Sequence, residues 1–405
     1  MINADKTLTF TFLNAVKWLV ISLIIAVLAG TASALFLFSL DWVTHWRESH
    51  LWIIAFLPFG GFLMGMIYHK FGKSVEAGNH LLIDEIHTPK SLVPLRMAPF
   101  VLIGTLVTHF FGGSAGREGT AVQMAGSLAD QLTKPFKLSH DDRRILLMAG
   151  MSAGFASVFG TPLAGAVFGL EVLVIKNARL KGILPCFLAG FLADAVTKAW
   201  GIHHTVYTIP IIPALTMLGV LNTAIAGIAF GITGLVFVKM THTISNGFKK
   251  YISFHPFRPL AGGAAVALAV WAIGTSKYIG LGIPTIQSAF SSQLPPQDFI
   301  LKMMFTSVTL GAGFKGGEVT PLFFIGAALG NALSYVLPLP TALLTGIGFV
   351  AVFAGAANTP LTCILLSIEI FGAKIGCYAV IACIVSYLCS GHAGIYTLNA
   401  KPTAK

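Results

Sequence analysis

Two short glycine-rich segments carry acidic side chains within an otherwise apolar chain. The sequence reads GGSAGREGT at residues 112–120 and GAGFKGGEVT at 311–320, so Glu118 and Glu318 each lie among glycines. Glycine lets the backbone approach a ligand closely, and a helix that begins after such a turn points free N–H groups and its positive dipole end at that ligand. Such a site favours an anion. Close helix packing also uses glycine, but it does not explain an acid in both turns.

The elements that must position these turns are membrane helices. The 405 residues are 55% hydrophobic and only 10% charged, with a mean hydropathy of +0.82, which lies far outside the range of soluble domains. The apolar runs are continuous, as in spanning helices, and do not alternate as in β-barrel strands. We expect helices at 18–40, 52–68, 97–111, 183–199, 213–240, 259–274, 341–357 and 361–388. The sequence therefore predicts an all-α polytopic protein in a lipid bilayer, with residues 1–405 forming one transmembrane domain.

The net charge of +11 comes from clusters of Lys and Arg between the apolar runs. By the positive-inside rule these loops are cytoplasmic, and we expect both termini on that side as well. Scattered loop charges on a membrane chain do not indicate nucleic-acid binding. The clusters are Lys70 and Lys73; Lys134, Lys137, Arg143 and Arg144; Lys176, Arg179 and Lys181; and Lys249, Lys250 and Arg258.

The remaining chemistry-bearing residues do not form a cofactor or metal site. All five cysteines lie in apolar segments without a CxxC pair, and no histidine stands at metal-ligand spacing. The string GAGFKGG lacks the spacing of a phosphate-binding loop, so the sequence does not indicate ATP binding. His80 can titrate near neutral pH, but no partner in the sequence assigns it a role.

An internal repeat connects the two acidic turns. GTPLAGAVFGLE at 160–171 matches NTPLTCILLSIE at 358–369, 198 residues later, and GREGT at 116–120 matches GGEVT at 316–320 with an offset of 200. The chain therefore reads as two homologous halves, 15–200 and 213–396, in which Glu118 and Glu318 are equivalent. Repeated halves with glycine- or proline-interrupted helices are typical of secondary transporters, whose substrate site lies at those interruptions.

Four segments together resemble the CLC family of chloride channels and anion/proton exchangers. GREGT is similar to the family's GREGP signature, and AGMSAGFASVFGTPLAGAVFGLE at 149–171 is similar to the segment that follows it. GGEVTP at 316–321 stands where the family has GGxFxP, and Tyr396 in GIYTLN resembles its late pore tyrosine. The resemblance implies a homodimer in which each subunit has its own anion pathway. It also implies two inverted-topology repeats whose broken helices meet at a central anion site.

The resemblance assigns roles to individual residues. Glu118 corresponds to the gating glutamate: a carboxylate is itself an anion, so it can fill the anion site when ionised and leave it when protonated. Arg117 is expected to brace its turn. The anion-binding positions implied by the match are Asn79, Gly116, Arg117, Gly119, Thr120, Val319, Thr320 and Tyr396. For Asn79 a helix cap is the alternative, and for Tyr396 an interfacial tyrosine.

Departures from the family pattern point to one branch. In AGNHLLID at 77–84, Asn79 replaces the family's usual serine. Thr120 replaces the proline of GREGP, and Val172 stands where many family exchangers carry an internal proton glutamate. This combination resembles the fluoride-exporting branch. Fluoride is small and strongly hydrated, so its site must replace water with good donors, which Asn79 and Thr320 can supply. Glu318 is a candidate for the proton pathway or for coupling.

The sequence therefore predicts an antiporter that exports cytoplasmic fluoride in exchange for protons, with no cofactor. A compact chain of this kind fits a bacterial plasma (inner) membrane. A chloride-selective or passive CLC channel is the alternative, because residue types do not separate the two. A membrane enzyme or receptor is a distant third reading, since it needs a clustered His, Asp, Glu or Cys site or a ligand-binding extension.

Overall fold

The computed structural model describes residues 2–172, 176–391 and 394–396, with side chains from residue 14 onward except 173–179. The described residues form helices and contain no β-strand, apart from one isolated bridge between Gly116 and Gly317. Four helical segments are long and apolar enough to cross a membrane: 14–49, 51–87, 180–199 and 217–251. The predicted all-α membrane fold is confirmed.

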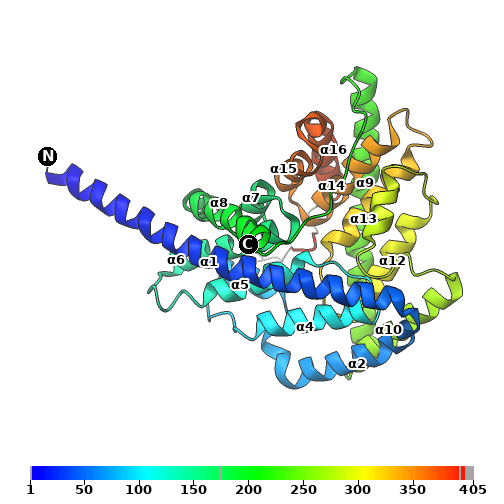
Figure 1. Ribbon diagram of the computed structural model, residues 1–405, viewed down its shortest axis with the longest axis horizontal. Helices are drawn as coiled ribbons and strands as arrows, with labels where there is room; N and C mark the ends of the chain where they lie inside the picture. Colours follow the sequence, from blue (N-terminus) through cyan, green and yellow to red (C-terminus); the bar gives the residue numbers. More distant parts are fainter. Residues whose placement is uncertain (1, 173–175, 392–393, 397–405) are drawn as a thin grey trace, which may run out of the picture.

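Before residue 200 the helices are α1 (Ile2–Ser49), η1 (Leu51–Phe56), α2 (Leu57–Ile67), η2 (Tyr68–Gly72), η3 (Lys73–Val75), α3 (Asn79–His87), α4 (Met97–Phe110), α5 (Glu118–Asp130), α6 (His140–Phe159), α7 (Pro162–Glu171) and α8 (Lys176–Ala199). After it they are α9 (Met217–Tyr251), α10 (Phe257–Ile273), α11 (Ile283–Ala289), α12 (Asp298–Gly311), α13 (Val319–Leu333), α14 (Thr341–Ala357), α15 (Pro360–Phe371), η4 (Ala373–Ile375) and α16 (Gly376–Cys389). In Figure 1 the blue and cyan helices α1, α4 and α5 lie to one side of the yellow helices α12 and α13.

Several helices are too short to cross a bilayer. Helix α7 has 10 residues, which at about 1.5 Å per residue gives about half the thickness of the hydrocarbon core. The sequence explains where these helices begin and end. Gly160 is the C-cap of α6 and Asn358 the C-cap of α14; both residues are left-handed, and in each case a Thr-Pro pair then starts the next helix. The expected helix at 361–388 is likewise two helices, α15 and α16, separated at Gly372, whose φ of 89° ends α15.

Large apolar side chains cover the outside of the bundle. Phe38, Trp271 and Leu388 are 70%, 80% and 70% exposed, as expected for helices that face lipid. The interior helices approach closely through glycine: a Cβ on Gly326 of α13 would lie 2.0 Å from the carbonyl oxygen of Gly348 on α14. This close approach packs α13 firmly in the middle of the protein.

A buried ionic network holds α3 and α5 in place. The Arg143 guanidinium on α6 lies 2.7 Å from the Asp130 carboxylate at the end of α5 and 3.0 Å from the Glu85 carboxylate on α3. All three side chains are almost fully buried, so each charge depends on its partners. The network therefore fixes the two helices whose first residues are Asn79 and Glu118.

Candidate functional site

The two glycine-rich turns meet in an antiparallel backbone pair. The Gly116 N–H donates to the Gly317 carbonyl at 2.6 Å, and the Gly317 N–H donates to the Gly116 carbonyl at 2.8 Å. Neither position accepts a side chain: a Cβ on Gly317 would lie 2.7 Å from the Gly119 nitrogen, and one on Gly116 would lie 2.9 Å from Glu118 Oε2. The glycines bring the beginnings of α5 and α13 face to face.

The Glu118 carboxylate fills the space between these two helix starts. It is fully buried, and it accepts hydrogen bonds from the Thr320 N–H at 3.0 Å, the Arg117 N–H at 3.1 Å and the Thr320 hydroxyl. Two of the donors come from α13 and one from the residue before α5, so both positive helix ends act on one negative group. A carboxylate held by N–H and O–H donors at helix N-termini occupies the kind of site that an anion prefers.

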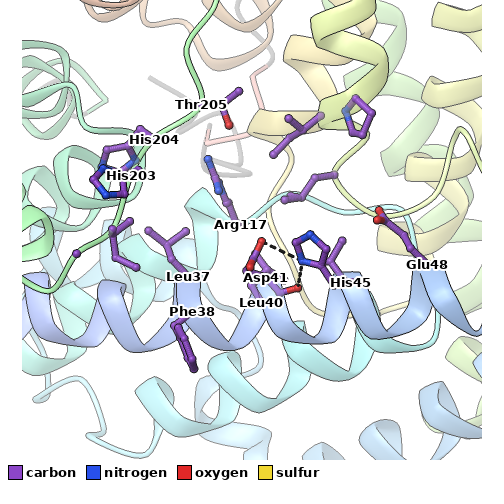
Figure 2. A pocket seen from close by; sticks show the side chains of 16 residues that line it. Leu37, Phe38, Leu40, Asp41, His45, Glu48, Arg117, His203, His204 and Thr205 are labelled. Carbon is purple, nitrogen blue, oxygen red and sulfur yellow. Dashed lines mark hydrogen bonds and ion pairs between the residues drawn. The ribbon is translucent and has the colours of Figure 1, made fainter.

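Arg117 joins this group to a cavity on one side of the turn. Its Nε lies 3.5 Å from Glu118 Oε1, and its side chain also lines a cavity of about 480 Å³. Figure 2 shows Arg117 between the α1 side chains Asp41 and His45 and the segment that carries His204. The interaction with Glu118 agrees with the expectation that Arg117 braces its turn.

The prediction that Glu118 and Glu318 are equivalent is wrong by one residue in the alignment of the two turns. Glu118 is the first residue of α5 and Arg117 precedes it as the N-cap, whereas in the second turn Glu318 is the N-cap and Val319 is the first residue of α13. Matching the helix starts therefore pairs Arg117 with Glu318. The sequence match aligned the two glutamates because they are the same residue type, although the backbone pair Gly116–Gly317 has an offset of 201.

Thr120 and Thr320 differ in what their hydroxyl groups bind. The Thr320 hydroxyl donates to Glu118, but the Thr120 hydroxyl pairs with that of Thr105 on α4 at 2.7 Å. Val319 is fully buried beside Thr320. The Thr120 hydroxyl therefore ties α5 to α4.

Asn79 is the first residue of α3 and lies next to the start of α5. The N-cap of α3 is Gly78, whose φ is 57°, and it makes no side-chain cap hydrogen bond. Asn79 Oδ1 is buried and has no hydrogen-bond partner among the described residues, so the capping alternative is wrong. Its Nδ2 lies 3.1 Å from where a Cβ of Gly119 would stand. The Asn79 amide therefore lies against the turn that carries Glu118.

Tyr396 approaches the same region from the end of the described chain. It is 7% exposed, and its ring packs edge-on against Phe168 at 5.8 Å. The Ile395 N–H donates to the Ala356 carbonyl at 2.9 Å, which holds this segment against the end of α14. The Tyr396 phenol interacts electrostatically with the carboxyl groups of Glu318 and Glu118. A tyrosine this buried is not an interfacial anchor.

Glu171 and Glu369, the last residues of the two matching segments, each bind the helix start of the other half. The Glu171 carboxylate at the end of α7 accepts from the N–H groups of Leu361 and Thr362, at 2.8 and 2.7 Å, at the start of α15. The Glu369 carboxylate on α15 accepts from Leu163 and Ala164, at 2.9 and 2.8 Å, at the start of α7. The two carboxylates therefore have a structural role at helix ends, and residue types alone did not predict this exchange of partners.

The amino-acid sequence is similar to those of known proteins. The model of the family described as voltage gated chloride channel matches residues 60–391. The chain belongs to the CLC family. A chloride/fluoride channel protein of Pseudomonas syringae pv. tomato is 58% identical over 386 residues, covering 94% of this chain and 85% of that protein. An H(+)/Cl(-) exchange transporter of Vibrio vulnificus is 25% identical, covering 87% of this chain and 81% of that protein.

Solved CLC structures have the same fold. A CLC-type fluoride/proton antiporter superposes with a TM-score of 0.91 at 35% identity, covering 94% of this chain and 97% of that one. A slow cyanobacterial Cl-/H+ antiporter gives a TM-score of 0.83 at 20% identity and shares the fold. The protein is a membrane ion transporter and not an enzyme, which excludes the third reading. The resemblance to the fluoride/proton branch of the family is confirmed.

Proposed function

We propose that this CLC protein exports cytoplasmic fluoride in exchange for protons, with Glu118 as the gate that carries the proton. The observation that carries the proposal is the Glu118 carboxylate, fully buried between two helix N-termini and bound by two N–H groups and a hydroxyl. Those donors serve any small anion that takes the carboxylate's place. Glu118 and the transported anion thus compete for one site.

Proton coupling follows from that competition. An ionised Glu118 is held by the helix ends, whereas a protonated Glu118 has lost the charge that those ends stabilise. One proton taken up by the carboxylate therefore frees the donors for one anion, and departure of the anion lets the carboxylate release its proton and return. Movement of fluoride in one direction is thereby tied to movement of protons in the other.

The donor set also supports selection of fluoride over chloride. Hydroxyl and amide N–H donors replace the water of a small, strongly hydrated anion more completely than that of a larger one. In our proposal the Thr320 hydroxyl, the Asn79 amide and the Tyr396 hydroxyl contact fluoride along its path. The backbone around Gly116, Arg117, Gly119 and Thr120 shapes the site, and Val319 excludes water. Glu318, at the start of α13 and close to Tyr396, holds or relays the proton on the other side of Glu118.

We further propose the assembly that the family resemblance implies. The protein is a homodimer of two independent pathways in a bacterial plasma membrane, with cytoplasmic termini. Each subunit consists of the inverted halves 15–200 and 213–396. Two observations support this division into halves. The chain breaks in the same way at Gly160 and Asn358, and Glu171 and Glu369 each cap a helix of the other half.

Transport from proteoliposomes tests the function. Vesicles loaded with fluoride or with chloride are followed with a fluoride or chloride electrode and a pH probe, for the wild type and for Glu118→Gln. We expect fluoride efflux with proton entry in the wild type, little chloride movement, and loss of proton movement in the variant. Fluoride efflux without proton entry would instead establish the passive channel, which the name of the Pseudomonas relative favours.

A further inference from the structure

The cavity beside Arg117 is lined by titratable groups from three parts of the chain. It has a volume of about 480 Å³, and besides Arg117 it is lined by Asp41, His45 and Glu48 of α1 and by His203, His204 and Thr205 between α8 and α9. In Figure 2 Arg117 stands at its centre, with the α1 side chains below it and the histidines to one side. The proposed transport cycle assigns no role to these groups.

The cavity lies on the side of the membrane away from the basic loops. Lys17, near the other end of α1, pairs at 2.9 Å with Asp142, beside the basic cluster at 134–144. Helix α9 ends at Lys249 and Lys250, so the segment before its first residue, Met217, lies at the opposite face. Because basic loops are cytoplasmic, the cavity opens toward the outside.

His204 lies in a niche that a glycine leaves for it. A Cβ on Gly160 would lie 2.3 Å from the His204 ring carbon Cδ2, and Gly160 has a φ of 73°, so a side chain here would displace the ring. His204 Nε2 is buried and has no hydrogen-bond partner among the described residues, although its ring lines the cavity. An imidazole held in place with a free buried nitrogen is available to a proton or to a small donor.

The surroundings keep His204 neutral at physiological pH. Burial, followed by the positive charges of Arg117, Lys198 and His203, lowers the pKa of His204 from 6.5 to about 4. A neutral imidazole accepts a proton on one nitrogen and can donate from the other, and an imidazolium with a carboxylic-acid-like pKa passes its proton readily to a carboxylate.

The other groups at the cavity favour protons over a resident anion. Asp41 and Glu48 stand at its exposed rim, where Asp41 lies 3.3 Å from the His45 ring and Glu48 lies 3.6 Å from Arg47. Carboxylates at the rim attract protons and repel anions. On the inner side Arg117 lines the cavity, and its Nε lies 3.5 Å from the Glu118 carboxylate.

We propose that His204 is the relay that passes protons between the external solution and Glu118 through this cavity. A ring nitrogen of His204 accepts a proton from solvent in the cavity, forming an N–H bond, and the imidazolium then yields one proton, through that solvent, to a Glu118 carboxylate oxygen. The net change is one proton moved from solvent to Glu118, with the neutral imidazole restored. This role rests on the proposed fluoride/proton exchange, because a passive channel has no need of it.

Chemical rescue tests the relay in proteoliposomes that contain fluoride. His204→Ala removes the ring and leaves the Gly160 niche open. We expect proton entry and fluoride efflux to slow together by about tenfold, less than the 10²–10⁴ range of a general acid or base because solvent still reaches the cavity. External imidazole should restore the rate in a pH-dependent way. His242→Ala, an exposed histidine of α9 far from the cavity in sequence, is the matched control and should show neither slowing nor rescue.

The outcomes separate the relay from the transport function. An unchanged rate in His204→Ala, or a slow rate that imidazole leaves unchanged, would overturn the relay while wild-type exchange still stood. Absence of proton entry in the wild type would overturn the exchange function itself. His204→Gln fills the niche without a titratable ring and so controls for misfolding. Its transport rate should be as low as that of His204→Ala, and imidazole should not restore it. A wild-type transport rate in His204→Gln would contradict the proposal.

Discussion

The two glycine-rich turns pair with each other through the same backbone contacts, yet they place different side chains at equivalent positions. At the first residue of the helix, the first turn has Glu118 and the second has Val319; one position earlier they have Arg117 and Glu318. The backbone supplies two equally oriented helix N-termini. The side chains differ, because only the Glu118 carboxylate accepts hydrogen bonds from both turns.

This difference indicates a division of labour between scaffold and gate. Both turns supply N–H donors and a positive helix end, and those features belong to the backbone. Only the first turn supplies a carboxylate that reaches across, because Glu118 accepts from Thr320 of the opposite turn. Among the described residues, no other residue donates a hydrogen bond to the carboxylate of Glu318, so it is not held in the anion position. Under the proposed exchange, Glu118 is therefore the gate between two similar helix N-termini.

Replacement of Glu118, which distinguishes the first turn from the second, should have the largest effect on transport. Glu118→Gln removes the charge that competes with the anion and the group that takes the proton, so fluoride-driven proton entry should fall by at least about 100-fold, in the range for loss of a general acid or base. Glu318→Gln keeps the gate and should slow coupled transport by a smaller factor. Parallel fluoride-electrode and pH recordings give both values. Equal losses in the two variants would mean that the glutamates act as one unit, and unchanged coupling in Glu318→Gln would remove that residue from the proton pathway.

A smaller effect separates the two threonines. Thr320→Val removes a hydroxyl that donates to a buried carboxylate, a bond of about 1.5–3 kcal/mol, and should weaken fluoride binding by roughly tenfold or more in titration calorimetry. Thr120→Val, the matched control, removes the pair with Thr105 and should lower stability while leaving fluoride affinity close to that of the wild type. The reverse pattern would place the anion on the α5 side of the site.

The sequence predicted the helices and singled out the two glycine-rich turns that the structure brings together, because both depend on local residue types. Continuous apolar runs require helices in a bilayer, and glycines beside an acid require a close backbone approach. The register between the two turns was wrong by one residue because the match relied on a shared glutamate. In the structure the first residues of α5 and α13 define the alignment of the two turns, and the Gly116–Gly317 backbone pair agrees with it.

Other features depended on contacts between residues distant in the sequence. Glu171 and Glu369 each stand at the end of an apolar run, but nothing local indicates that each carboxylate binds the other half's helix start. The His204 niche likewise arises only when the segment after α8 folds against the end of α6 at Gly160. At the corresponding end of α14 the chain has Asn358, whose Nδ2 would lie 2.6 Å from a Cβ on Gly394.

The crossed caps give a still smaller effect, on stability. Glu171→Gln leaves one acceptor oxygen where the carboxylate had two, and it weakens the interaction with the α15 helix end by about 1–2 kcal/mol. We expect Tm to fall by about 2–4 °C in thermal unfolding of the detergent-solubilised protein, and Glu369→Gln should do the same at α7. The double variant should show roughly the sum, since the two caps are separate contacts. A double variant no worse than either single change would show that the caps act as one linked unit.

The smallest effect concerns His204 and the pH dependence of stability. Its pKa is lowered from 6.5 to about 4 in the folded protein, so between these values the unfolded chain binds more protons than the folded one. His204 therefore has no effect on stability above about pH 6.5 and reduces stability progressively as the pH falls toward 4. His204→Gln should flatten the decline of Tm between pH 6.5 and 4.5 without changing Tm at pH 8. An equally steep decline of Tm in the variant would mean that the His204 imidazole is solvated. The niche at Gly160 would then not hold the ring away from water.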